Sequence, residues 1–185
     1  SADVILYAGS LVAPEMLDYA SKNATLFNSA GMNLADQVTL MVEAAQKGKT
    51  IVRLHTGDPS IFGAIDEQIR ALEIAGVVCE IIPGVSAAFA AAAALGIEFT
   101  LPEITQTLIL TRASGRTPVP ELENLRELAS HRSSLAIFLS TGMIATVVDE
   151  LLFAGYSTET PIAVVYRASW PDQKIRSEEH TSELQ

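Results

Sequence analysis

Short runs of β-branched and other apolar residues alternate with segments of helical spacing along nearly the whole chain. Such alternation is typical of α/β proteins, in which helices connect neighbouring strands of a parallel sheet. Most of the runs are apolar throughout, as expected for strands that are covered on both faces. The sequence therefore predicts an α/β fold, with strands at Val4–Tyr7, Ala24–Phe27, Thr50–Leu54, Val77–Ile82, Leu108–Thr111, Leu135–Leu139 and Ile162–Tyr166.

Capping residues mark the ends of the predicted helices. An apolar stripe over residues 34–45 follows Asn33, a residue type suited to cap a helix N-terminus. Two further helices are predicted at residues 61–75 and 143–154. Because helices commonly end at glycine, their ends are predicted at Gly48, Gly76 and Gly155.

The chain is predicted to contain two small α/β domains, residues 1–104 and residues 105–175. The boundary falls in residues 96–107, which show no clear period and contain Pro102. Residues 176–185 have no apolar periodicity and resemble the translation of a sequencing adapter, so they are predicted to be an artefact. The alternative is an ordinary polar C-terminal tail, which composition does not reject.

Composition excludes several classes of protein. The formal net charge is −10, whereas binding to nucleic acid requires a basic face, so no nucleic acid is expected as a partner. The longest apolar run, residues 86–95, is mostly alanine and far shorter than the roughly 20 residues that span a bilayer, so no membrane is expected either. A single cysteine, Cys79, excludes a disulfide framework and a cysteine-based zinc site. With no secretory signal visible, these features predict a soluble cytoplasmic protein that binds no metal.

Three turns that follow predicted strands contain unusual residues. We name them the first turn (residues 7–12, YAGSLV), the second turn (residues 54–63, LHTGDPSIFG) and the third turn (residues 82–87, IPGVSA). Ligands of parallel sheets bind beyond the carboxyl ends of the strands, so together these turns predict a cleft lined by main-chain groups. Taken singly, each turn is better explained by ordinary turn chemistry and helix capping.

The second turn and residues 82–88 resemble, in order and spacing, the G-D-P-x-x-x-G and P-G-x-S-A motifs of the tetrapyrrole (corrin/porphyrin) methylases. The first turn and residues 107–112 (TLILTR) are similar to the branch that methylates precorrin-4 or cobalt-precorrin-4 at carbon 11. The resemblance extends from Ser1 to about Ile175. It implies a homodimeric C-methyltransferase of cobalamin and porphyrin biosynthesis. The methyl donor would be S-adenosyl-L-methionine (SAM), bound in a cleft between two α/β domains, and the acceptor a precorrin.

The resemblance also implies functional residues. It places cofactor contacts at Thr56, Gly57, Asp58, Ile61, Ser86, Ala87, Leu139 and Ala168. An alternative role for Asp58 is to cap the following helix. Contacts with the substrate are predicted at Tyr7, Gly9, Ser10, Arg112 and Arg116. The arginines are chosen because tetrapyrroles carry many carboxylates, and Arg53 and Arg167 are further candidates. No catalytic residue is identified, since a lone histidine such as His55 is more often a structural hydrogen-bonding group.

Both ends of the chain depart from the family's pattern. The opening strand with its G-x-G-P-G-D turn is missing ahead of Ser1, and the final strands after Ile175 are missing as well. Because a sheet that lacks strands exposes unpaired edges, this fragment is predicted to be unstable or inactive. Two other functions are left open: a sister methylase that acts on another precorrin, a protein or ribosomal RNA, and a noncatalytic module that binds SAM or a tetrapyrrole.

Overall fold

A computed structural model describes residues 2–178 of the chain and confirms the α/β class. Contacts within the chain divide it into two compact units, residues 1–87 and residues 88–185. Helix α3 (Ala87–Leu95) begins at this division. The predicted domain boundary after residue 104 stays a prediction.

The first unit is built on a parallel sheet of three strands in the order β2-β1-β3. In the register of the sheet, Val4 of β1 lies between Thr25 of β2 and Ile51 of β3. The three carboxyl ends therefore lie along one edge, where the first and second turns begin. The strands are β1 (Val4–Tyr7), β2 (Thr25–Asn28) and β3 (Ile51–Leu54).

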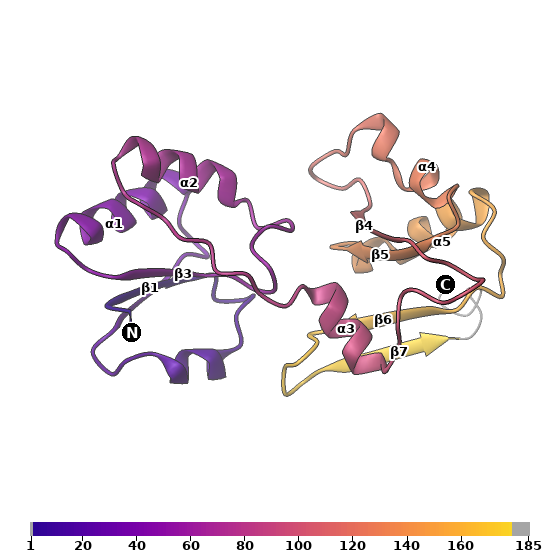
Figure 1. Ribbon diagram of the computed structural model, residues 1–185, viewed down its shortest axis with the longest axis horizontal. Coiled ribbons are helices and arrows are strands. Elements are labelled where there is room, and N and C mark those ends of the chain that lie inside the picture. The colour runs from indigo at the N-terminus through magenta and orange to yellow at the C-terminus, as the bar shows by residue number, and fades with distance from the viewer. Residues whose placement is uncertain (1, 179–185) are drawn as a thin grey trace. The chain divides into compact units, whose positions relative to one another are not determined.

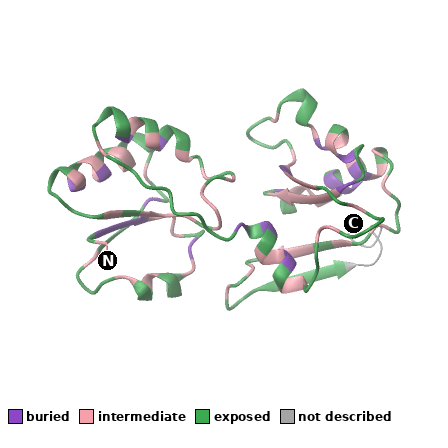
Figure 2. Ribbon diagram, in the orientation of Figure 1, coloured by how far each residue is buried: buried purple, intermediate pink, exposed green. Residues whose placement is uncertain are grey.

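Helices α1 (Leu34–Gln46) and α2 (Ile65–Ile74) cover one face of this sheet (Figure 1). The core beneath them consists of Leu6, which is fully buried, with Met41 and Leu72; the buried residues of β1 are purple in Figure 2. As predicted, Asn33 caps α1, because its side-chain oxygen accepts a hydrogen bond from the Asp36 N–H at 2.9 Å. A short 3-10 helix, η1 (Pro14–Tyr19), connects β1 to β2.

The second unit contains two pairs of strands. Strands β4 and β5 are parallel and are covered by helices α4 and α5, whose core residues are Leu125, Ala129, Val147 and Leu151. Strands β6 and β7 form an antiparallel pair. The elements are β4 (Leu108–Arg112), η2 (Glu121–Glu123), α4 (Leu125–Ala129), β5 (Ser134–Phe138), η3 (Thr141–Met143), α5 (Ile144–Phe153), β6 (Ile162–Tyr166) and β7 (Lys174–Glu178).

Two predicted elements are corrected by the structure. The strand predicted at Val77–Ile82 is wrong: no described strand pairs with this segment, and Val78 is 97% exposed. A β-branched run favours extended backbone, but a strand also needs a neighbour for its N–H and C=O groups. The helix predicted from residue 61 begins only at Ile65, because Phe62 and Ala64 adopt left-handed φ angles of 55° and 49° that interrupt a helix.

Strand β7 includes residues 176–178, which were predicted to belong to an artefact, whereas residues 179–185 lie outside the described residues. The origin of this tail stays a prediction. Among residues 2–178, no helix combines the length and the apolar character needed to cross a lipid bilayer.

Candidate functional site

The Asp58 carboxylate fastens the second turn to the third. One oxygen accepts hydrogen bonds from the Ser60 N–H at 2.9 Å and from the Ser60 hydroxyl, and the other accepts from the Gly84 N–H at 3.0 Å. The Ser60 hydroxyl, followed by the Gly84 and Ser60 N–H groups, holds the pKa of this carboxyl below its usual range. Asp58 does not cap α2, which starts at Ile65. Its carboxylate instead forms hydrogen bonds within the second turn and with the third turn.

Glycines let the same two turns approach each other closely. Gly57 has a φ of +69°, a conformation that other residues rarely adopt. A Cβ atom on Gly84 would lie 2.2 Å from the carbonyl oxygen of Gly57. The main chains of the second and third turns are therefore in contact, and only glycine fits at position 84.

The first turn joins this cluster through one further hydrogen bond, and a second bond holds it to the end of β2. The Thr56 hydroxyl of the second turn donates to the Leu11 carbonyl, and the Gly9 N–H donates to the Asn28 side-chain oxygen at 3.1 Å. All three turns thus meet within residues 1–87. Asn28 was not among the residues predicted from the sequence; its position at the carboxyl end of a parallel strand was the available signal.

Ser86 contributes a buried hydroxyl without a partner. The residue is 6% exposed, and its hydroxyl oxygen makes no hydrogen bond with any described residue. A buried polar group without a partner is costly, so this hydroxyl suits a ligand that supplies one. Ser86 stands directly before α3, next to the exposed Ala87, where helix N–H groups are free to bind an anion.

The other predicted residues of the first unit lie close to the strand ends. Ile61 is half-buried, and its N–H donates to the Asp58 carbonyl at 3.3 Å. The Tyr7 carbonyl accepts hydrogen bonds from the N–H and the hydroxyl of Ser29, whereas Ser10 is exposed. His55 follows β3 and is half-buried; burial, and then the charge of Arg53, lower the pKa of its imidazole, which keeps it neutral at pH 7.

Two predicted cofactor contacts and two predicted substrate contacts lie in the second unit, together with the further candidate Arg167. Leu139 follows β5 and is 80% exposed, and Ala168 lies in the turn after β6. The Arg112 guanidinium donates to the carbonyls of Thr117 and Pro118 at 2.7 and 3.0 Å, so it closes its own loop. Arg116 lies exposed in that loop. Their roles toward a ligand stay predictions.

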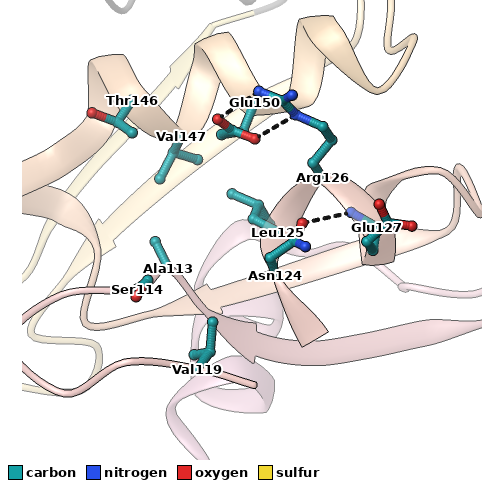
Figure 3. A pocket seen from close by; sticks show the side chains of 10 residues that line it. All are labelled: Ala113, Ser114, Val119, Asn124, Leu125, Arg126, Glu127, Thr146, Val147 and Glu150. Atoms are coloured by element: carbon teal, nitrogen blue, oxygen red, sulfur yellow. Dashed lines mark hydrogen bonds and ion pairs between the residues drawn. The ribbon is translucent and has the colours of Figure 1, made fainter. Parts of the chain in front are cut away.

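The second unit also contains a hollow of about 420 Å³ between the loop after β4, helix α4 and helix α5. Figure 3 shows Arg126 and Glu150 paired across it, with N–O distances of 2.9 and 3.0 Å. Arg126 also lies 3.6 Å from the centre of the Phe153 ring. None of the predicted functional residues lines this hollow, and its arginine is already paired.

Replacing Asp58 by asparagine is expected to flatten the pH dependence of stability in the acid range. Because folding lowers the pKa of Asp58, the ionised carboxylate stabilises the protein above roughly pH 4, and this contribution is lost as the pH falls through the lower folded pKa. Thermal unfolding between about pH 6 and pH 3 measures the effect, since the wild-type Tm should fall more steeply than the variant's. The same slope in the Asp58→Asn protein as in the wild type would contradict the assignment.

Comparisons with known proteins find relatives over nearly the whole chain. The family model for tetrapyrrole (corrin/porphyrin) methylases matches residues 1–183. The chain is 60% identical, over 174 residues, to the cobalt-precorrin-4 C(11)-methyltransferase of Methanocaldococcus jannaschii; the match covers 94% of this chain and 67% of the relative.

Two solved structures are similar to the whole fold. The X-ray structure of a cobalt-precorrin-4 methyltransferase, a cobalamin biosynthetic enzyme, has a TM-score of 0.95 and 48% identity, and it matches 99% of this chain and 76% of that chain. A uroporphyrin-III C-methyltransferase from Thermus thermophilus, complexed with S-adenosyl homocysteine, has a TM-score of 0.80 and 25% identity, with 100% of this chain and 78% of that chain covered.

Proposed function

Because the chain belongs to the tetrapyrrole (corrin/porphyrin) methylases, we propose that it transfers a methyl group from SAM to carbon 11 of precorrin-4 or cobalt-precorrin-4 in cobalamin biosynthesis. The observation that carries this proposal is the 60% identity to a cobalt-precorrin-4 C(11)-methyltransferase across 94% of the chain. A homodimer in the cytoplasm, as predicted from the sequence, is part of the same proposal.

The cluster of three turns fits the methyl donor. The buried Ser86 hydroxyl has no hydrogen-bond partner between residues 2 and 178, and the N–H groups in the first turn of α3 suit a carboxylate. Because Gly57 and Gly84 lack side chains, the main chains of the second and third turns pack together, and backbone groups of both turns lie side by side. We propose that Thr56, Gly57, Ile61, Ser86 and Ala87 hold SAM, and that Asp58 sets the position of the two turns. Leu139 and Ala168 complete the proposed set.

In the proposed reaction, the main task of the protein is to align the methyl donor with the acceptor carbon. Bound SAM supplies a methyl group that is already activated by its positively charged sulfur. Orienting the acceptor carbon toward this methyl group accounts for most of the catalysis that such a transfer needs. The neutral imidazole of His55 adds no further positive charge near the strand ends. Tyr7, Gly9, Ser10, Arg112 and Arg116 are proposed to contact the substrate.

Turnover tests this function directly. The full-length gene product is incubated with methyl-labelled SAM and, in separate reactions, with precorrin-4, cobalt-precorrin-4 or uroporphyrinogen III. Label at carbon 11 of one of the precorrin-4 forms supports the proposal, and the faster of the two reactions identifies the form with or without cobalt. Transfer only to uroporphyrinogen III indicates a sister methylase, and binding of SAM without any transfer indicates a noncatalytic module. The same assay on the 185-residue chain by itself tests the prediction that it is inactive.

A further inference from the structure

Arg53 has unused hydrogen-bonding capacity near the carboxyl edge of the β2-β1-β3 sheet. One terminal nitrogen donates only to main-chain carbonyls, those of Leu6 at 3.3 Å and Leu54 at 3.4 Å. The Nε atom is buried and has no hydrogen-bond partner among the described residues. A guanidinium carries five N–H donors, so most of them are not used by the protein itself.

The charge of Arg53 also lacks a counter-ion in the described part of the chain. The ion pairs between residues 2 and 178 join Asp66 to Arg70, Arg126 to Glu150 and Arg167 to Asp172. Burial lowers the pKa of the Arg53 guanidinium, which reflects the cost of holding a half-buried charge without a partner. The chain has 22 acidic and 12 basic residues, so a shortage of acids does not explain the unpaired arginine.

The other arginines considered for substrate binding are more fully engaged. The Arg112 guanidinium is bonded to the carbonyls of its own loop. Arg167 pairs with Asp172 at 2.6 Å and lies 4.5 Å from the centre of the Trp170 ring. Arg116 lies exposed in a loop. Arg53 alone among these four is held half-buried at the end of a strand with a buried donor left over.

We propose that Arg53 binds a carboxylate of a ligand at this edge of the sheet. The inference rests on the proposed function, which supplies two ligands with carboxylates: the amino-acid end of SAM and the acid side chains of the tetrapyrrole. A planar guanidinium matches a carboxylate through two parallel hydrogen bonds, and the buried setting strengthens the pairing. Arg53 precedes His55 by two residues, and its charge already lowers the pKa of that imidazole.

Arg53→Gln and Arg53→Lys in the full-length gene product test this proposal, with Arg70→Gln as the control on an exposed face of α2. Calorimetry measures the affinity for S-adenosyl homocysteine, and a spectral titration in its presence measures the affinity for precorrin-4 and cobalt-precorrin-4. Arg53→Gln should lower the affinity for one ligand by roughly 10- to 100-fold, because one charged hydrogen-bonded contact is lost. The affinity for the other ligand should stay within about twofold of the wild-type value. Arg53→Lys should recover part of this affinity, since it restores the charge without the planar fork.

The ligand that loses affinity identifies the source of the carboxylate. Selective loss of the tetrapyrrole assigns Arg53 to the substrate, and selective loss of S-adenosyl homocysteine assigns it to the cofactor. An NMR titration adds a second readout: the ligand concerned should raise the pKa of His55 in the wild type, and Arg53→Gln should remove this rise. Unchanged affinities, or equal losses of both ligands, would overturn the assignment. Failure of the wild type to bind either ligand would contradict the proposed function itself.

Discussion

Replacing Gly84 by alanine should abolish measurable binding of S-adenosyl homocysteine to the full-length gene product. The new Cβ atom would lie 2.2 Å from the Gly57 carbonyl oxygen, which is main chain and cannot rotate away. The third turn must move, and this breaks the hydrogen bond from the Gly84 N–H to Asp58. We expect the free energy of unfolding to fall by about 1–3 kcal/mol, as for other overpacked sites. Calorimetry and urea unfolding measure the two effects.

Gly31→Ala is the matched control for this experiment. A Cβ atom on Gly31 meets nothing within 4 Å, so neither binding nor stability should change. If Gly84→Ala bound S-adenosyl homocysteine as tightly as Gly31→Ala, the contact between the second and third turns would not be part of the cofactor site.

Leu6→Ala should cost the protein about 2–5 kcal/mol of unfolding free energy. Leu6 is the fully buried centre of the first unit, where it packs against Met41 of α1 and Leu72 of α2. Removing its side chain leaves a cavity between the sheet and both helices, which the surrounding backbone closes only in part. Urea unfolding, followed by circular dichroism, measures the loss.

Ile74→Ala provides the comparison for this core substitution. Ile74 is 89% exposed at the end of α2, so removal of its side chain should change stability by less than about 0.5 kcal/mol. Equal effects of the two substitutions would show that α1 and α2 do not pack on β1 through Leu6. The sheet would then hold its carboxyl edge, and with it the three turns, by other contacts.

Local patterns predicted the elements that carry their own signals. The strands Val4–Tyr7 and Ile162–Tyr166 have the predicted bounds, and Asn33 caps α1 as expected from its residue type. The segment Val77–Ile82 has an equally strong β-branched pattern, but no described strand lies beside it. Pairing is a property of two segments, so a pattern read from one segment cannot supply it.

The positions of the three turns followed from the rule that parallel strands end at one edge of a sheet. Their mutual contacts did not. Asp58 and Gly84 are 26 residues apart in the chain, and Thr56 and Leu11 are 45 apart. The sequence predicted that Asp58 contacts the cofactor or caps a helix, whereas the fold uses one of its oxygens to hold the third turn.

The sequence by itself determined the α/β class, the places where the chain turns at strand ends, and the family resemblance of the second and third turns. These features depend on neighbours in the chain: residue periodicity, glycine and proline at turns, and capping side chains. Only the tertiary structure decided which polar groups found partners. In the tertiary structure, Arg112 donates hydrogen bonds to its own loop. Ser86 and Arg53 each keep a buried polar atom that has no partner among the described residues. Whether a buried polar group has a hydrogen-bond partner depends on which residues folding places beside it, and the spacing of residues along the chain does not determine those neighbours.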